Sequence, residues 1–388
     1  MRGLFIHDHK FPKGNGSYYY SYGFDKEFFS RYLSIFDELE VIGRQVEARD
    51  ATKKDSNIIQ SDISFFTFKS LKQLLSKKTR NVFKNKIIQS EYVVIRVPSI
   101  FGLYGAFIAR KYNKPYIIEV VGCAWDAIIH KGSSKIFAAT IITYLTKLIV
   151  KKANYVIYVT EEFLERRYPT KGNYIACSNV TLNSVNDADI NNRLEMIDKI
   201  DLNNKLIFGT CATIDVVYKG QEDVMKVIHK LVKEGYNIEY QLVGGGNKKY
   251  LESVARKLGI SNRVKFIGTL EHKEVFRWLE SIDFYVHPSK QEGLSRAIIE
   301  AMSKGCPIFA ANAGGIHELI DKEFIFDKGN VNQIYNIFKS FSKYEMSEQA
   351  INNYNNSKKY LKPLLYQRRN EFYNKFKNES KNKNGVKI

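Results

Sequence analysis

Short apolar runs alternate with amphipathic stretches along the second half of the chain. Strands are predicted at 205–210, 238–246, 263–268, 283–289 and 306–311. Helices are predicted at 221–235, 248–259, 272–282 and 294–305. Strands that are apolar throughout and separated by amphipathic helices are typical of a parallel sheet covered on both faces. This half of the sequence therefore predicts a doubly wound α/β domain of Rossmann type.

The first half follows the same pattern less regularly. Its predicted strands are 3–8, 38–43, 92–98, 115–122 and 154–160. Its predicted helices are 25–37, 64–85, 100–112, 135–152 and 161–167. We therefore expect a second Rossmann-like domain, and two such domains facing one another would leave a cleft at the carboxyl ends of their strands.

A chain of 388 residues exceeds the usual size of one domain, which agrees with two. The polar stretch 183–205 is interpreted as the linker region, and the expected domains are 1–195 and 196–350. Residues 351–375 are expected to form a helical segment that packs back toward the N-terminal domain. Residues 376–388, polar and basic, are expected to be a disordered tail.

The most apolar stretch, 135–153, is interrupted by Lys147 and is shorter than a membrane-spanning helix needs. No secretory leader pattern is recognised. The four cysteines are far apart and form no C-x-x-C motif, so we expect reduced thiols and a cytosolic location.

The formal net charge of +19 is concentrated in two regions. Residues 51–150 hold 16 basic and 5 acidic residues, and residues 341–388 hold 11 and 4. A localised excess favours an anionic partner, which could be nucleic acid, anionic lipid or a phosphorylated substrate. A solvated basic face without a partner is the alternative.

Candidate chemistry appears at 291–307, where Glu292 and Glu300 bracket an apolar helical run. A carboxylate accepts two hydrogen bonds and so suits the vicinal hydroxyls of a sugar or a ribose. Between the acids, a predicted helix N-terminus near Leu294 or Ser295 offers free N–H groups and a positive dipole end to a phosphate. The alternative is an exposed Arg296–Glu300 pair of little energetic weight.

The run "HPSKQEGLSRAIIEAMSKGCPIFAANAGGIHELI" resembles the E-x7-E signature of the family 4 glycosyltransferases. The runs "YKGQ" (218–221), "LVGGG" (242–246) and "RVKFIG" (263–268) match in the order of that family. The resemblance is strong across 205–325 and weak in 1–200. It implies the two-domain GT-B fold and transfer of a sugar from a nucleotide-sugar with retention.

The resemblance also implies roles for single residues. Glu292 and Lys219 would be catalytic, Glu292 at the donor-sugar hydroxyls and Lys219 at the diphosphate, while Glu300 would bind the ribose. A fixed ammonium stabilises a leaving nucleoside diphosphate as it gains charge, so no metal or other cofactor is expected. The remaining donor-binding candidates are Gly293, Leu294, Ser295, Arg296, Gly244, Ile267 and Thr213.

The chain departs from the family pattern at two positions. Thr213 stands where the family usually has an arginine, and Arg296 is considered as a replacement cation. Val121 precedes Gly122 where many members have a histidine, so Trp125, Asp126 and His130 are weak candidates for that role. Gly14 and Gly16 resemble the glycine loop that lies over the diphosphate.

Two sequence runs suggest metal binding only superficially. The "DAD" at 187–189 lies in the predicted linker and is interpreted as a solvated loop. The "HDH" at 7–9 cannot point three side chains one way from a strand, so we interpret it as cleft-lining or acceptor-binding.

Residues 64–88 mix aromatic and aliphatic residues with lysines and an arginine, which predicts a basic amphipathic helix at a membrane surface. A core-packed helix with a charged outer face is the alternative. Membrane attachment would fit a polyprenyl-diphosphate-linked acceptor and a cytoplasmic protein peripheral at the inner face of the membrane.

The sequence thus predicts a glycosyltransferase that moves a hexose or N-acetylhexosamine from a UDP- or GDP-sugar to a glycan or lipid-linked acceptor, in bacterial surface polysaccharide synthesis. A GT-B hydrolase or epimerase of nucleotide-sugars is one alternative. A basic nucleic-acid-binding protein is the other, but no nucleic-acid-binding motif supports it.

Overall fold

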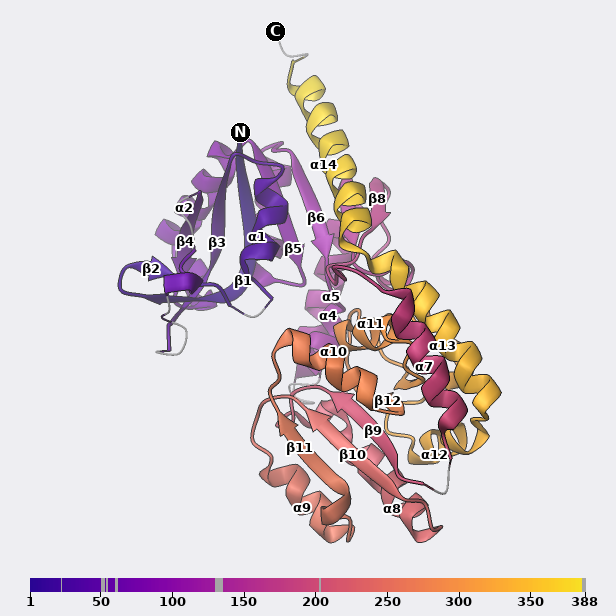
Figure 1. The fold of residues 1–388 in the computed structure, drawn as a ribbon. Coiled ribbons are helices and arrows are strands. Elements are labelled where there is room, and N and C mark those ends of the chain that lie inside the picture. The colour runs from indigo at the N-terminus through magenta and orange to yellow at the C-terminus, as the bar shows by residue number, and fades with distance from the viewer. Residues whose placement is uncertain are drawn as a thin grey trace. The chain divides into compact units, whose positions relative to one another are not determined.

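The computed structural model of the chain describes residues 1–21, 23–49, 53, 55–59, 62–129, 135–201 and 204–385. It divides into two compact units (Figure 1). Unit 1 comprises Met1–Cys177 and Tyr366–Ile388, and unit 2 comprises Ser178–Leu365. The chain therefore crosses between the units twice, once at 177–178 and again at 365–366.

Unit 1 is built on a parallel sheet with the strand order β4-β3-β1-β5-β6-β7-β8. Its strands are β1 (Arg2–Gly14), β2 (Ser17–Tyr18), β3 (Glu38–Glu47), β4 (Ile63–Phe68), β5 (Tyr92–Val97), β6 (Tyr116–Val120), β7 (Tyr155–Tyr158) and β8 (Asn173–Ala176). Its helices are α1 (Lys26–Leu33), α2 (Lys77–Gln89), α3 (Ile100–Lys111), α4 (Ala124–Ile129), α5 (Ile136–Lys151) and α6 (Phe163–Arg167). The short strand β2 pairs antiparallel with the end of β1.

Alternation along the central strand covers both faces of this sheet. Leu4 and Ile6 belong to a core with Phe83 of α2 and Phe101 of α3. Phe5 faces the other way and packs edge-on against Phe28 of α1, with ring centroids 5.6 Å apart. Because both faces are buried, the strands carry continuous apolar runs, which explains the sequence pattern.

Unit 2 contains a second parallel sheet with the order β11-β10-β9-β12-β13-β14. Its strands are β9 (Leu206–Cys211), β10 (Ile238–Val243), β11 (Val264–Gly268), β12 (Phe284–His287), β13 (Ile308–Ala311) and β14 (Ile325–Phe326). Its helices are α7 (Asp187–Lys199), α8 (Gln221–Lys233), α9 (Lys249–Lys257), α10 (His272–Ser281), α11 (Arg296–Ser303), α12 (Val331–Ser340) and α13 (Lys343–Ser357). The predicted strands and helices of this half all appear within a few residues of their expected bounds.

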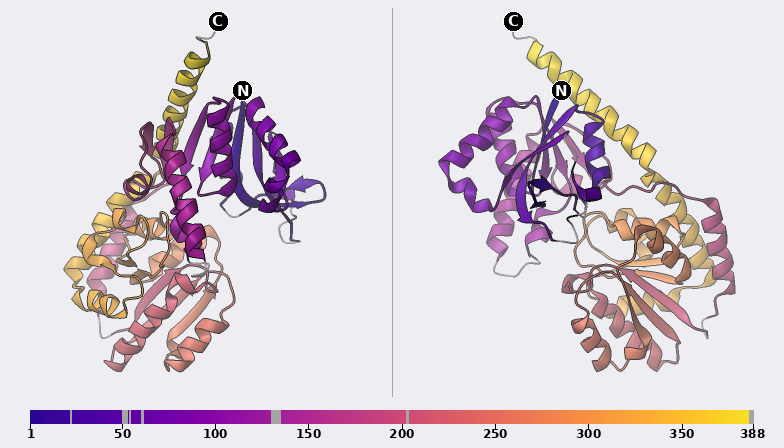
Figure 2. Two further views of the ribbon diagram at one scale, coloured as in Figure 1. Left: turned by 180° about the vertical axis from the view of Figure 1, so that it is seen from behind. Right: turned by 60° about the vertical axis from the view of Figure 1, so that its left-hand side comes forward.

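The C-terminal helix α14 (Lys362–Gly385) returns to unit 1 (Figure 2). Its Tyr373 hydroxyl donates a hydrogen bond of 3.1 Å to the buried carboxylate of Glu119 on β6. The Tyr32 hydroxyl of α1 donates to the other oxygen of Glu119 at 2.8 Å. Phe376 of α14 packs on Tyr92 and Tyr155. These contacts show why an apolar and aromatic face persists so near the end of a polar sequence.

The domain bounds therefore differ from the predicted ones. Unit 1 ends at Cys177 rather than at 195, and residues 376–385 continue a helix rather than a disordered tail. The predicted linker 183–205 contains helix α7, which packs against α13 and buries Ile190 and Ile197. The "DAD" run is the first turn of α7, where Asp189 pairs with Lys304 at 2.9 Å, and is no solvated loop.

The basic segment 64–88 is a strand, a 3-10 turn and a helix instead of one amphipathic helix. Strand β4 pairs with β3 along its length. Helix α2 buries Phe83 and Ile87 in the core and exposes Lys77 and Lys78, while Lys86 pairs with the buried Glu40 at 2.6 Å. The alternative of a core-packed helix with a charged outer face describes α2. Within the described ranges, no helix has the length and apolar character needed to cross a bilayer.

Arg193 connects α7 to the rest of unit 2 through hydrogen bonds. The sequence pattern does not predict that this residue is buried, because arginine is polar. Its guanidinium donates hydrogen bonds of 2.7 Å to the carbonyl groups of Leu279 and Ile282. A third bond of 3.2 Å reaches the carbonyl of Lys304. The side chain thus supplies donors to carbonyl groups at the ends of α10 and α11.

We expect Arg193→Met to lower the free energy of unfolding by about 3–5 kcal/mol, because it leaves these buried carbonyl groups without donors. Urea unfolding followed by circular dichroism measures the loss. Lys199→Met on the exposed end of α7 is the control and should change stability by less than about 0.5 kcal/mol. Equal effects of the two substitutions would contradict the role of Arg193.

Candidate active site

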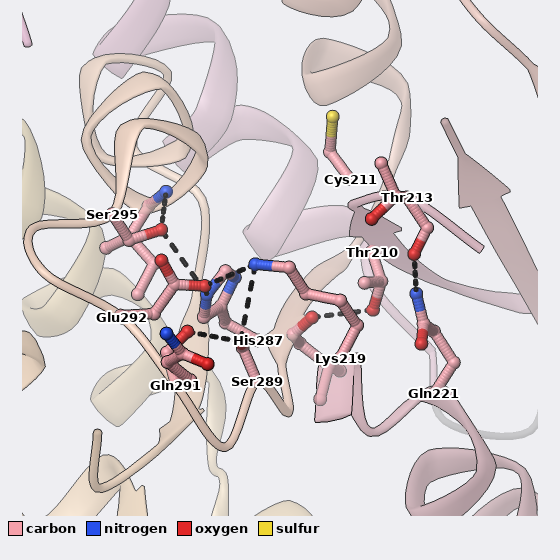
Figure 3. A network of polar contacts seen from close by, with 12 residues as sticks. Thr210, Cys211, Thr213, Lys219, Gln221, His287, Ser289, Gln291, Glu292 and Ser295 are labelled. Atoms are coloured by element: carbon pink, nitrogen blue, oxygen red, sulfur yellow. Dashed lines mark hydrogen bonds and ion pairs between the residues drawn. The ribbon is translucent and has the colours of Figure 1, made fainter. Parts of the chain in front are cut away.

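A lysine and a glutamate meet where strands β9 and β12 of unit 2 end. Lys219 Nζ lies 2.8 Å from Glu292 Oε1, and the two side chains are only 19% and 14% exposed. His287 Nε2, at the end of β12, lies 3.1 Å from the same carboxylate oxygen. Figure 3 shows the ammonium of Lys219 pointing at this carboxylate, with the ring of His287 beside it.

These partners determine the charge of Glu292. Burial by itself raises the pKa of Glu292, but the hydrogen bond to His287 and the nearby ammonium of Lys219 outweigh it and lower the pKa to about 2. The carboxylate is therefore ionised throughout the physiological pH range. A charged acceptor beside a charged donor can bind polar ligands that have both hydroxyl and phosphate groups.

Gly220 explains how Lys219 comes so close to Glu292. Its φ of 74° is in the left-handed region, and a Cβ atom there would lie 2.2 Å from the carbonyl oxygen of Pro288. The backbone N–H of Lys290 also donates to the carbonyl oxygen of Tyr218 at 2.8 Å. Only glycine allows the two loops to approach this closely. This close approach places Lys219 next to Glu292.

The loop between the two acids leads into helix α11. Ser295 caps the helix, its hydroxyl accepting from the N–H of Ile298, and Gly305 at φ 58° follows its end. Within the described residues, the backbone N–H groups of Gly293, Leu294 and Ser295 donate to no acceptor. These N–H groups and the positive end of the helix dipole suit an anionic ligand such as a phosphate.

The backbone of Gly314 and Gly315 packs against this loop. A Cβ atom on Gly314 would lie 2.2 Å from the carbonyl oxygen of Glu292, and φ at Gly314 is 58°. The N–H of Gly315 donates to the carbonyl oxygen of Gly293 at 2.8 Å. The "GG" of the sequence motif therefore sets the backbone position of the acid and of the N–H groups.

Glu300, the second acid, is buried on α11 with 6% of its side chain exposed. Its carboxylate lies 2.9 Å from Nε2 of His272, the first residue of α10. Arg296 is at the outer limit of an ion pair, 4.0 Å away, and is half exposed. Glu300 is thus not simply half of an exposed i,i+4 pair, although the structure does keep Arg296 near it.

The site rests on a buried polar chain of hydrogen bonds. The Tyr285 hydroxyl lies 3.3 Å from His287 Nδ1 and accepts from the N–H of Cys211. Ser295 Oγ lies 3.3 Å from His287 Nε2, so the ring contacts both the acid and the helix cap. Burial and the charge of Glu300 raise the pKa of the Cys211 thiol to about 12, which makes it an inert neighbour.

The other donor-binding candidates lie at the carboxyl ends of neighbouring strands. Gly244 follows β10 with φ 146°, and a Cβ atom there would lie 2.0 Å from the carbonyl oxygen of Ala212. The Thr213 carbonyl oxygen accepts from Gln221 Nε2 at 3.0 Å. Ile267 is partly exposed on β11. Within the described part of the chain, Gly244, Thr213 and Ile267 form no hydrogen bond with Glu292.

The candidates of unit 1 are dispersed. Gly14 is the last residue of β1 and pairs with Ser17 of β2, and Gly16 lies in the hairpin turn between the two strands. The predicted loop after the first strand is therefore a hairpin. Asp126 lies in the first turn of the short helix α4, and His130 lies outside the described residues.

The "HDH" run lies within β1. Burial lowers the pKa of His7 and that of His9, the latter to about 4, and the nearby Arg96 adds to both effects. Asp8 Oδ2 accepts from the N–H of Ile100 at 2.9 Å. Among the residues that the structure describes, no three His, Cys, Asp or Glu side chains lie close enough together to hold a metal ion.

Comparison with known proteins decides the family. Residues 194–359 match the family model described as Glycosyl transferases group 1. The chain is 36% identical to Protein CapJ of Staphylococcus aureus over 340 residues. The aligned region covers 85% of this chain and 84% of CapJ. The chain belongs to the group 1 glycosyltransferases. It is an enzyme, a hexosyltransferase, and the predicted family is confirmed.

Solved structures confirm the predicted GT-B fold. The Anabaena protein Alr3699/HepE, crystallised with UDP and glucose, has a TM-score of 0.66 and 17% identity, over 96% of this chain and 98% of that chain. WaaG, a glycosyltransferase involved in lipopolysaccharide biosynthesis, has a TM-score of 0.61 and 14% identity, over 96% and 99%. These two solved structures therefore share the fold of the present chain over nearly its whole length.

Sequence reasoning missed two histidines of this candidate site. His287 contacts Glu292 from the end of β12, and His272 contacts Glu300 from α10. The position of His287 directly before "PSKQE" at a strand end was a usable signal. His272 is 28 residues from Glu300, so only the fold brings it close.

We expect Gly220→Ala to lower the free energy of unfolding by about 2–4 kcal/mol, since the added methyl group overlaps the Pro288 carbonyl at a left-handed φ. Gly235→Ala is a matched control, because φ is 97° there but nothing lies within 4 Å of the added Cβ atom. The control should cost only about 1 kcal/mol. Thermal unfolding compares them, and equal losses would contradict the close-approach argument.

Proposed function

We propose that this glycosyltransferase transfers a hexose or N-acetylhexosamine from a UDP- or GDP-sugar to a glycan or polyprenyl-diphosphate-linked acceptor, with retention and without a metal. The observation that carries the proposal is the buried ion pair of Lys219 with Glu292 beside the free N–H groups that precede α11. Hydroxyl-binding and diphosphate-binding groups lie next to one another there, as a nucleotide-sugar requires.

Each group of the site has a chemical task in this proposal. The ionised Glu292 accepts hydrogen bonds from hydroxyl groups of the donor sugar, and the ammonium of Lys219 faces the diphosphate. The N–H groups of Gly293 and Leu294 bind phosphate oxygens. The buried Glu300, oriented by His272, accepts from the ribose hydroxyls.

The reaction exchanges one C–O bond for another. The acceptor hydroxyl oxygen attacks the anomeric carbon on the face that the leaving group departs from, as the bond to the phosphate oxygen breaks. The hydroxyl proton passes to that phosphate oxygen, so the products are the glycoside and a nucleoside diphosphate. Lys219 and the dipole of α11 stabilise the negative charge that develops on the leaving group.

The relatives support the donor class and the setting. Alr3699/HepE was also crystallised with UDP-glucose. A mannosyltransferase of Corynebacterium glutamicum that is 29% identical over 119 residues is GDP-mannose-dependent. The role of WaaG in lipopolysaccharide biosynthesis supports a bacterial surface polysaccharide as the product class. We place the enzyme at the cytoplasmic face of the cell membrane, where a lipid-linked acceptor is accessible.

Thermal shift with UDP-glucose, UDP-N-acetylglucosamine and GDP-mannose tests the donor site. One nucleotide class should stabilise the wild-type chain, because a ligand that binds the folded state raises the melting temperature. Lys219→Gln should weaken nucleotide binding about 10-fold to 100-fold and lower kcat about 10²-fold or more. Glu300→Gln should weaken nucleotide binding about 10-fold.

Lys226→Gln on the exposed side of α8 is the charge-matched control and should leave binding unchanged. Wild-type binding in the Lys219→Gln and Glu300→Gln variants would contradict the proposed site. Nucleotide release without any acceptor would favour a hydrolase, and an inverted anomeric configuration in the product would overturn retention.

A further inference from the structure

Helix α5 of unit 1 is apolar on the side that the fold does not bury. Ala139, Thr146 and Val150 pack inward, and Ile142 and Ile149 lie against the core. The outward side carries Phe137 and Tyr144, which are 78% and 61% exposed, together with exposed Ile136, Ile141 and Leu145. A surface helix of a globular protein normally presents polar residues on this side.

Exposed lysines occur along this helix, and no acid lies near them in the sequence. Lys135, Lys147, Lys151 and Lys152 are exposed, and no Asp or Glu occurs between residues 127 and 160. The left view of Figure 2 shows α5 in the foreground of unit 1. Exposed aromatic rings flanked by basic residues are the composition of a helix that lies in the headgroup region of a bilayer.

We propose that α5 is the membrane-docking surface of this protein and that its partner is an anionic lipid bilayer. The helix is too short to span a bilayer, so Phe137, Ile141 and Tyr144 insert among the acyl chains while the lysines contact the headgroups. Docking through α5 would explain how the protein reaches the membrane location proposed above. The docking proposal does not depend on the donor site.

Helix α2, the other basic element, does not offer this combination. Its apolar residues Phe83 and Ile87 are buried in the core, and Ile88, 37% exposed, is the one large hydrophobic residue of this described helix that is exposed. Leu75, which lies just before α2, is 78% exposed. Attachment through α2 would therefore be mainly electrostatic. Variants of α2 serve as controls for variants of α5.

Co-sedimentation of the full chain with vesicles tests the proposal. The chain should bind vesicles of phosphatidylcholine with phosphatidylglycerol and bind weakly to phosphatidylcholine alone. A lysine near an anionic surface contributes a factor of about five in the partition coefficient, so Lys147→Gln with Lys151→Gln should reduce it about 25-fold. Phe137→Ser with Tyr144→Ser should reduce it at least about 10-fold.

Matched controls on α2 make the test specific. Lys77→Gln with Lys78→Gln removes the same charge, and Leu75→Ser removes an exposed apolar residue; each should reduce partitioning less than about threefold. Losses equal to those of the α5 variants would overturn the assignment to α5. Failure of the wild-type chain to bind anionic vesicles would also overturn it.

A second copy of the chain is the other conceivable occupant of this side. Size-exclusion chromatography with light scattering distinguishes it: a wild-type dimer that Phe137→Ser with Tyr144→Ser makes monomeric would overturn the membrane proposal. Unfolding temperature and nucleotide-induced stabilisation are measured for each variant, and both should match the wild type. Since the vesicle test uses neither donor nor acceptor, its failure leaves the donor-site proposal standing.

Discussion

The ion pair of Lys219 and Glu292 is the constraint on which the site of unit 2 depends. Two mostly buried charges of opposite sign are stable together because each replaces the water that the other has lost, and either one alone would be costly. His287 and the N–H groups before α11 surround the pair with further polar groups. A ligand that bears both hydroxyl and phosphate groups can then be held by groups that are already in place.

Backbone geometry supports this pair in addition to the side chains of His287 and Ser289. Gly220 lets the lysine loop touch the end of β12, and Gly314 lets a third segment touch the carbonyl of Glu292. The carboxyl ends of parallel strands supply three loops at one edge, and glycines at two of them permit contact distances that any side chain would prevent. The same arrangement explains why the acids and the glycines occur together in the sequence.

The sequence was sufficient where its signals are local. The stretch 291–307 carries its own cap, glycine stop and acids, so the position of α11, with Glu300 on the helix and Glu292 in the loop before it, was predicted correctly. Helix α7 was missed because Arg193, its central buried residue, looks polar in the sequence and is satisfied only by carbonyl groups far along the chain. Strand β4 was predicted as helix because its pairing with β3 is a tertiary contact. His272 was missed for the same reason, because it lies 28 residues from Glu300 along the chain.

A double-mutant cycle on unfolding free energy tests the central ion pair most directly. Lys219→Met and Glu292→Gln are measured singly and together by urea unfolding without ligand. The account predicts that the double variant is more stable than the sum of the single losses implies, by about 1–3 kcal/mol, because each single change leaves one buried charge alone. Losses that add within about 0.3 kcal/mol would show that the two side chains do not depend on one another and would contradict the account.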